Sequence, residues 1–435
     1  MWADGGEPKP YDGACPHETV SLARGEFNGR ILYCIAHGWV FDGHTGKCLQ
    51  PAGWNEGISP APSGRDGPGR SRFGVTMFDT VIAGGGLCGL AIASGLRGRF
   101  ALFEARNRLG GRILSVQCGA QRVDLGPTWF WPEMQPRMSR IVSDLGLESF
   151  PQHESGTVLH LKDAEEKPSK VRIEDVHGGA RRLSGGMASL VEALSAGIPN
   201  DAIRLGMELV AARNRSDHVE LVFRSGETAE IVRCRQAVLA IPPRLLAEKV
   251  RFEPGLDERT MHAMRAAQTW MAGQAKAVVG FEAPFWRRAG ESGNAFVSHA
   301  QAVLGEIFDA CDGDHAALGG FFALSPDFRA SVHQESMNLL ISSQFVQLFG
   351  IQAEKGELRI QDWAREPYTC SRLDLAPTEG HPEYGDPALC LPLWEGKLFL
   401  GGSETAGYGG GYMEGALESA ARIRQSLYAG ELVNG

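Results

Sequence analysis

The stretch MFDTVIAGGGLCGLAIASGL, residues 77–96, decides the fold of most of this chain. Its first seven residues form an apolar run typical of a buried strand, and residues 87–96 are small and apolar, as in a tightly packed helix. Between them lies the pattern Gly84-x-Gly86-x-x-Gly89. In such a turn the first glycine allows the sharp bend, the second lets the backbone approach a pyrophosphate, and the third lets helix and strand pack closely. The sequence therefore predicts a dinucleotide-binding α/β unit.

The residues that follow this turn extend the same unit. Residues 101–103 read as the next parallel strand, and Glu104 ends it twenty positions after Gly84. That spacing suits a carboxylate that binds a ribose hydroxyl of the dinucleotide. The alternative is a glycine-rich turn in some other α/β protein. The fingerprint by itself does not separate FAD from NAD.

The segment EARNRLGGR, residues 104–112, separates them. It resembles the glycine–arginine segment that follows the fingerprint in flavin-containing amine oxidases, the family of monoamine, polyamine and L-amino-acid oxidases. The resemblance implies FAD, with Arg106 and Arg112 beside Gly111 neutralising its pyrophosphate. Without the fingerprint, two arginines beside glycines would indicate a solvated surface loop. The likeness runs from residue 77 to about residue 428.

The resemblance also predicts the domain organisation. An α/β, Rossmann-like FAD-binding domain is interleaved with a substrate domain in residues 77–435. The FAD-binding segments are about 77–150, 185–245 and 356–430, and the substrate-domain segments are about 151–184 and 246–355. Before them, residues 56–76 are rich in serine, proline and glycine and read as a linker.

Further segments imply further cofactor contacts. In DLGPTW, residues 124–129, Gly126 would let the backbone pass the isoalloxazine ring. By the same resemblance, Val210 meets the adenine through its backbone and Glu404 binds the ribityl–phosphate part of FAD. Met413 opens a helix whose positive end faces the flavin pyrimidine, where reduced flavin gathers negative charge.

Three residues are expected at the reaction centre. Lys276, a lone cation in an apolar strand before Pro-Phe-Trp, matches the family lysine that is bonded through a water to flavin N5. A buried lysine is costly, so the alternative is an edge strand with Lys276 pointing outward. Trp363 resembles a tryptophan that packs near the flavin ring, although a core tryptophan is an alternative. Tyr412 is expected to face the substrate.

Two positions depart from the monoamine oxidases. Some of these enzymes attach FAD to a cysteine, and that position is Arg372 here, with Cys370 near but out of register. We therefore expect non-covalent FAD. The next position, a tyrosine that forms one wall of an aromatic cage, is Leu373. With Tyr412 alone retained, the resemblance to monoamine oxidases does not identify the substrate.

Near the start of the chain, two mixed pairs suggest an iron–sulfur cluster. Cys15-Pro16-His17 and Cys34-Ile35-Ala36-His37 resemble the Rieske motif, which implies that Cys15 and Cys34 hold one iron of a [2Fe–2S] cluster and His17 and His37 hold the other. We expect residues 1–55 to form a small all-β Rieske domain with an incomplete base sheet, since few residues flank the ligand loops. A zinc site or unligated pairs are the alternatives.

Composition excludes several other classes of function. The net charge of −9 and the lack of a basic stripe argue against nucleic acid as a partner. Nine scattered cysteines and no secretory signal indicate a reducing, cytoplasmic location. The uncharged residues 80–96 are interrupted by glycines, and we expect no membrane anchor.

Together these features predict an FAD-dependent oxidoreductase that oxidises a carbon–nitrogen bond. A small-molecule amine would transfer hydride to the flavin and give an imine that hydrolyses, and the Rieske cluster would carry single electrons to or from the flavin. The electron acceptor or donor would be O2 or a redox protein. The alternatives are a desaturase of a carbon–carbon or ring substrate, and an electron-transfer module without a small substrate.

Overall fold

The structure is a computed structural model that describes residues 77–376 and 380–433 together with four short N-terminal strands. The chain divides into two compact units, Met1–Phe73 and Gly74–Gly435. The strands of the first unit form an antiparallel sheet in the order β1 (Glu26–Phe27), β2 (Ile31–Cys34), β3 (Trp39–Asp42), β4 (Cys48–Gln50). The predicted cluster ligands Cys15, His17 and His37, and the side chain of Cys34, lie outside the described residues.

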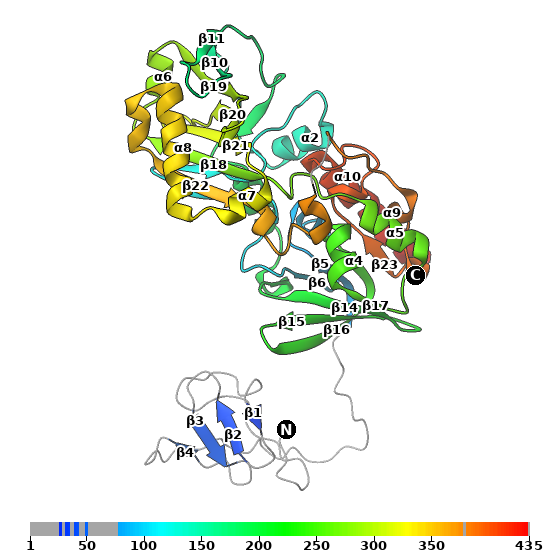
Figure 1. Ribbon diagram of the computed structural model, residues 1–435. Coiled ribbons are helices and arrows are strands. Elements are labelled where there is room, and N and C mark those ends of the chain that lie inside the picture. The colour runs from blue at the N-terminus through cyan, green and yellow to red at the C-terminus, as the bar shows by residue number, and fades with distance from the viewer. Residues whose placement is uncertain are drawn as a thin grey trace, which may run out of the picture. The chain divides into compact units, whose positions relative to one another are not determined.

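The larger unit begins with the predicted strand, turn and helix, and the structure confirms them (Figure 1). β5 (Met77–Ala83) leads through the glycine turn into α1 (Leu87–Ala93), and β6 (Phe100–Phe103) pairs parallel to β5. These strands belong to an eight-stranded sheet. Its other strands are β13 (Ile203–Arg204), β14 (Glu208–Asn214), β15 (Val219–Ser225), β16 (Thr228–Leu239), β17 (Arg251–Glu253) and β23 (Leu398–Leu400).

Both faces of this sheet are covered by other elements, and neighbouring residues of its central strands point to opposite faces. Ile82 of β5 packs in a core with α1, α3 (Ala188–Ala196) and α10 (Met413–Val433). Val81, its neighbour, packs in a second core on the other side. Burial on both faces explains why the β5 sequence is apolar almost throughout.

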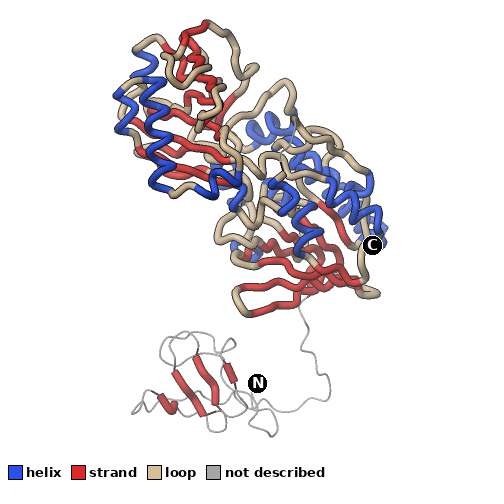
Figure 2. Tube along the Cα trace, viewed as in Figure 1, coloured by secondary structure: helices blue, strands red, loops and turns tan. Residues whose placement is uncertain are grey.

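The larger unit contains a second sheet, of seven strands. Figure 2 shows its strands apart from those of the first sheet. In spatial order these are β11 (Ser169–Val171), β10 (Thr157–Leu161), β19 (Glu291–Val297), β20 (Leu304–Asp309), β21 (Ala316–Phe322), β18 (Ala275–Phe281) and β22 (Glu357–Asp362). One face packs against α8 (Gln334–Phe349), which buries Ala277 and Val279 of β18. Lys276 lies on the opposite face with Val278. Because β18 is paired on both sides and Lys276 is buried, the alternative of an outward-pointing lysine on an edge strand is wrong.

The remaining elements connect or cover the two sheets. β7 pairs with β8, and β9 pairs with β12. Their bounds and those of the remaining helices are β7 (Ser115–Cys118), β8 (Gln121–Asp124), β9 (Ser149–Pro151), β12 (Arg181–Leu183), α2 (Pro136–Asp144), α4 (Pro243–Lys249), α5 (Glu258–Ala266), α6 (Phe285–Arg288), α7 (Pro326–Ser331) and α9 (Pro387–Cys390), with 3-10 turns η2 (Asn200–Ala202), η3 (Ile351–Lys355), η4 (Trp363–Arg365), η5 (Arg372–Leu375), η6 (Trp394–Gly396) and η7 (Ser403–Thr405). Among the residues that the structure describes, no helix is long and apolar enough to cross a membrane.

Two strands lie in a different sheet from most strands of their expected segment, and the division into FAD-binding and substrate segments stays a prediction. β22 falls in the expected FAD-binding segment 356–430 and lies in the seven-stranded sheet beside β18. β17 falls in the expected substrate segment 246–355 and pairs with β14 in the eight-stranded sheet. Both strands are short and half-exposed, and their sequences carry no period that assigns them to one sheet or the other.

Candidate functional site

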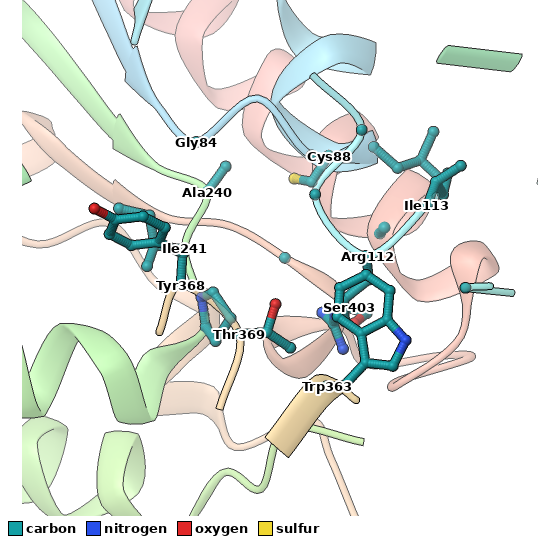
Figure 3. A pocket seen from close by; sticks show the side chains of 18 of the residues that line it. Gly84, Cys88, Arg112, Ile113, Ala240, Ile241, Trp363, Tyr368, Thr369 and Ser403 are labelled. Carbon is teal, nitrogen blue, oxygen red and sulfur yellow. The ribbon is translucent and has the colours of Figure 1, made fainter. Parts of the chain in front are cut away.

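A cavity of about 390 Å³ lies in the larger unit (Figure 3). It is lined by residues of both sheets' strands and loops and by the beginnings of α1 and α10. Eleven of the fourteen predicted cofactor and catalytic residues line it, namely Gly84, Gly86, Glu104, Arg106, Gly111, Arg112, Gly126, Lys276, Trp363, Tyr412 and Met413. Gly89, Val210 and Glu404 do not line this cavity. Residues that are far apart in the sequence thus meet around one space.

The glycine turn has the geometry that its sequence requires. Gly84 has a φ of +112°, and a Cβ there would lie 2.2 Å from the carbonyl oxygen of Ala240. A Cβ at Gly89 would lie 2.0 Å from the Gly84 oxygen, so only glycine allows α1 to pack this closely against the turn. Gly89 lies away from the cavity. A Cβ at Gly86 would meet nothing within 4 Å. The backbone at Gly86 is therefore open to a ligand.

Glu104 is fixed at the end of β6 by the turn itself. Its Oε2 accepts a hydrogen bond from the Gly85 amide at 2.7 Å, and its Oε1 accepts one from the Arg106 amide at 2.8 Å. Arg106 in turn donates to Glu366 at 2.8 Å. The carboxylate is thus held at the cavity wall, where it can accept a hydrogen bond from a ribose hydroxyl.

Glu404 is almost completely buried, at 1% exposure, and pairs with a predicted phosphate-binding residue. Its Oε1 lies 2.7 Å from Nη1 of Arg112 and accepts from Ser403 Oγ at 3.0 Å. Figure 3 shows Arg112 and Ser403 together at the cavity. Burial lowers the pKa of Arg112, but the charge of Glu404 offsets this and the pKa is raised.

The second oxygen of this carboxylate tests whether FAD fits. Oε2 of Glu404 is buried and has no hydrogen-bond partner among the described residues. A buried carboxylate oxygen without a partner is unfavourable, so a ligand hydroxyl at this place would satisfy it. A ribityl chain carries such hydroxyls. The open backbone at Gly86, the carboxylate of Glu104 and this oxygen together fit an FAD molecule.

Lys276 is 2% exposed and faces the cavity from the second position of β18. Its Nζ donates to the Gly126 carbonyl at 3.0 Å and to the Thr128 hydroxyl. The rings of Phe308 and Phe321 surround it, with centroids 5.1 and 5.2 Å from Nζ. Burial lowers the pKa of Lys276 to about 7, because the partial compensation by the charge of Asp124 is smaller. Near neutral pH the amine is therefore present in both protonation states.

Asp124 is an acidic residue that we did not assign to the site from the sequence. It is buried at the end of β8 and accepts hydrogen bonds from Ser115 Oγ at 2.5 Å and the Met187 amide at 2.9 Å. Burial raises its pKa, while Ser115 and the charge of Lys276 lower it. Its position two residues before Gly126 in DLGPTW was the only signal available.

The other two predicted catalytic residues are held differently. Trp363 is buried, and its Nε1 donates to the Leu125 carbonyl at 2.9 Å, so it is both a core residue and part of the cavity wall. Tyr412 is exposed and stacks on His381 with ring centroids 4.8 Å apart and planes 6° from parallel. His381 also contacts Trp270, at 4.7 Å between centroids.

The aromatic neighbours of Tyr412 were missed because they lie in irregular segments without a motif. Trp131 meets Tyr412 edge-on, at 6.3 Å and 79°. Trp131 and Trp270 line the cavity, whereas Leu373, at the position of the second cage wall, is 51% exposed and does not. The ring nearest Tyr412 is thus an imidazole, supplied by His381.

Comparison with known protein families agrees with this geometry. The model of the family described as flavin containing amine oxidoreductase matches residues 166–423, more than half of the chain. The chain belongs to this family. A model of an NAD(P)-binding Rossmann-like domain matches residues 82–145, and a model of the Rieske [2Fe-2S] domain matches residues 1–54.

Curated relatives are flavin-containing amine oxidases. Amine oxidase [flavin-containing] A of Sus scrofa is 25% identical over 307 residues, which is 68% of this chain and 56% of that protein. Amine oxidase [flavin-containing] A of Equus caballus is 23% identical over 81% of this chain and 85% of its own length. The chain thus spans little more than half of some relatives that it matches.

Solved structures confirm the fold of this flavin amine oxidoreductase. A putrescine oxidase bound to putrescine has a TM-score of 0.67 and 18% identity over 81% of this chain and 99% of that one. Cyclohexylamine oxidase from Brevibacterium oxydans has a TM-score of 0.67 and 18% identity over 82% of this chain and all of its own. The family match indicates FAD as a cofactor, and the Rieske match indicates a [2Fe–2S] cluster.

Proposed function

We propose that this chain oxidises the carbon–nitrogen bond of a small amine with FAD, and that the Rieske cluster carries single electrons to or from the flavin. The observation that carries the amine part is Lys276, which is buried in a family-matched fold and faces the cavity on the same side as aromatic residues. FAD, when bound, accepts the hydride from the substrate carbon.

The chain's own residues would bind and orient the amine. The rings of Trp129, Trp131, Phe321 and Tyr412 line the cavity and give this part of it an apolar surface. Tyr412 and Trp131 offer ring faces and edges against which an amine and its apolar substituent can pack. Lys276, with a pKa lowered to about 7, can hold or release a proton at Nζ within the cavity.

The charge of the lining supports a monoamine as substrate. Among the residues that line the cavity, the acidic side chains are Glu104 and Glu208. The carboxylate of Glu104 accepts hydrogen bonds from the amides of Gly85 and Arg106. Glu208 lies two residues before Val210, the expected adenine contact. Neither is expected beside the aromatic rings, where the second ammonium group of a diamine would need a carboxylate. We therefore propose an amine with one cationic group and an apolar body.

Anaerobic mixing of the purified, FAD-loaded protein with defined amines tests this function. Benzylamine, cyclohexylamine, putrescine and an L-amino acid serve as probes, and flavin absorbance is followed. We expect bleaching with the monoamines and a far slower reaction with putrescine. If no amine reduces the flavin while dithionite does, the proposed amine oxidation is wrong.

Two further parts of the proposal have their own tests. Electron paramagnetic resonance of the dithionite-reduced protein should give a Rieske signal, and its absence from anaerobically purified protein would contradict the cluster. We also propose that FAD is held without a covalent bond, since Arg372 stands at the attachment position. Acid precipitation should then release all flavin into the supernatant.

A further inference from the structure

The first turn of α2 is capped by a residue of another helix. An N-cap side chain usually accepts a hydrogen bond from the amide of the second or third helical residue. Gln135, the N-cap of α2, makes no such bond. Instead Glu414 of α10, fully buried, accepts from the Arg137 amide at 3.2 Å and from the Met138 amide at 2.9 Å. Glu414 therefore caps α2 in place of Gln135.

This arrangement leaves the Gln135 side chain available to the cavity. Gln135 is 5% exposed and lines the cavity wall. Its Oε1 accepts a hydrogen bond from the Trp131 amide at 3.4 Å, which fixes the orientation of the side-chain amide. No hydrogen bond from its Nε2 is found among the described residues, and Nε2 is not one of the fully buried atoms without a partner, so the open space of the cavity reaches it. A nearly buried amide with a free donor indicates a ligand with an acceptor.

The position of Glu414 indicates which ligand this is. Glu414 directly follows Met413, the cavity-lining first residue of α10, which is expected at the flavin pyrimidine. Because Glu414 binds the amides of Arg137 and Met138, it holds the first turn of α2 against the first turn of α10. Gln135 is thereby placed on the same side of the cavity as Met413. Trp131, whose amide bonds Gln135, also contacts the ring of Tyr412, and Tyr412 directly precedes Met413.

We propose that Gln135 is a flavin-binding residue whose Nε2 donates a hydrogen bond to a carbonyl oxygen on the pyrimidine edge, and that Glu414 is its positioning residue. The inference rests on the proposed binding of FAD in this cavity and does not depend on which amine is oxidised. A donor at this edge binds reduced flavin more tightly than oxidised flavin, because reduction adds negative charge there. Gln135 therefore raises the flavin midpoint potential.

The test is the midpoint potential of the flavin in the holoprotein carrying Gln135→Met. Redox titration followed by flavin absorbance, with the cluster followed by electron paramagnetic resonance, gives this potential without amine turnover. Loss of one hydrogen bond to a charged acceptor should shift the reduction equilibrium by about tenfold. For a two-electron couple this lowers the potential by about 30 mV. An unchanged potential would overturn the proposal, as would a change confined to the KM of the amine, which would make Gln135 a substrate contact.

Gln344→Met is the matched control. Gln344 is a buried amide on α8 and bonds Val303, Leu304 and the Leu304 carbonyl, away from the cavity. Its replacement should lower the melting temperature and leave the flavin potential unchanged. If Gln344→Met lowered the potential as much as Gln135→Met, the effect would be general destabilisation and the proposal would be wrong.

Glu414→Ala tests the positioning role. Without Glu414, the Gln135 side chain is free to cap its own helix, so the potential should fall as in Gln135→Met. Adding Gln135→Met to Glu414→Ala should then cause no further fall. Fully additive shifts would contradict the coupling between the two residues. If Glu414→Ala does not fold, the Gln135→Met measurement alone decides the proposal.

Failure of this inference is distinguishable from failure of the proposed function. A protein that binds FAD, shows the predicted potential shift and oxidises no amine would retain the role of Gln135 and reject amine oxidation. A protein that oxidises amines with an unchanged potential in Gln135→Met would do the reverse.

Discussion

Lys276 is the side chain on which the proposed chemistry depends most. It is a cation buried among Trp129, Phe308 and Phe321, with hydrogen bonds to a carbonyl and a hydroxyl, and it forms no ion pair with a carboxylate of the described residues. Burying a charged lysine lowers the stability of the fold. Such buried ionisable groups cluster at functional sites, where they serve a ligand. The energetic argument and the family resemblance therefore assign the same role to Lys276.

Replacing Lys276 with Met should slow anaerobic flavin reduction by roughly a hundredfold while FAD stays bound. The methionine fills the space between the rings, but it neither donates to Gly126 and Thr128 nor carries a proton. Stopped-flow absorbance at the flavin band measures the rate. Lys397→Met, which removes a surface lysine bonded to the Arg215 carbonyl, is the control. Equal rates in both variants and the wild type would remove Lys276 from the mechanism.

The same lysine predicts how stability depends on pH. Its pKa in the folded protein is lowered from 10.5 to about 7, so between these values the unfolded chain binds more protons than the folded one. The free energy of unfolding then rises with pH across this window, and below pH 7 the full cost of burying the charged amine is present. Lys276→Met lacks this contribution. Its stability relative to wild type should be greatest below pH 7 and decline towards pH 10.

Denaturant titrations of both proteins at pH 6.5 and pH 9 measure this difference. The wild type should gain free energy of unfolding relative to Lys276→Met at the higher pH. A difference that does not change with pH would mean that the folded lysine titrates near its ordinary value.

The glycine turn shows how one element separates folding from binding. A Cβ at Gly89 would lie 2.0 Å from the Gly84 oxygen, so Gly89→Ala must push α1 away from β5. We expect it to cost about 1–3 kcal/mol of stability and to weaken FAD binding as a consequence. A Cβ at Gly86 meets no protein atom within 4 Å. Gly86→Ala should therefore keep the wild-type melting temperature of the apoprotein and lose FAD affinity alone, because the methyl group occupies space that the pyrophosphate needs.

Apoprotein melting and FAD titration by fluorescence distinguish these two effects. If Gly86→Ala bound FAD as tightly as the wild type, the pyrophosphate would not pass over this part of the turn.

The elements that the sequence predicted well are those with a local physical signature. β5, α1 and β6 were predicted because an apolar run, a glycine turn and a second apolar run leave few alternatives, and α10 because its apolar residues recur at helical spacing. His381, Trp270 and Trp131 could not be assigned from the sequence. They lie in irregular segments, and their contacts with Tyr412 and one another exist only through tertiary packing.

Gln135 shows a second limit of sequence reasoning. Pro136 is the first residue of α2, and Gln135, the N-cap residue before it, makes no side-chain cap bond. The cap comes instead from Glu414, more than 270 residues later in the chain. A bond between such distant residues leaves no local pattern, so the freed side chain becomes visible only in the structure.

At the level of the whole molecule, the two cofactors belong to different units of the chain. The Rieske match covers residues 1–54, within the first unit, while every residue that lines the cavity belongs to the second. Hydride transfer from an amine needs only groups around the cavity. Because a Rieske cluster changes charge by one electron at a time, we propose that it exchanges single electrons with the acceptor.

Removing the cluster should therefore separate the two halves of the catalytic cycle. In the double variant Cys15→Ser and Cys34→Ser, we expect the rate of anaerobic flavin reduction by amine to equal that of the wild type, because no cavity-lining residue changes. Reoxidation by a one-electron acceptor such as ferricenium should slow by at least tenfold if electrons leave through the cluster. Stopped-flow measurements of the two half-reactions, with electron paramagnetic resonance to confirm loss of the cluster, make the comparison. Slower flavin reduction with unchanged reoxidation would mean that the first unit supports the structure of the cavity and does not carry electrons from it.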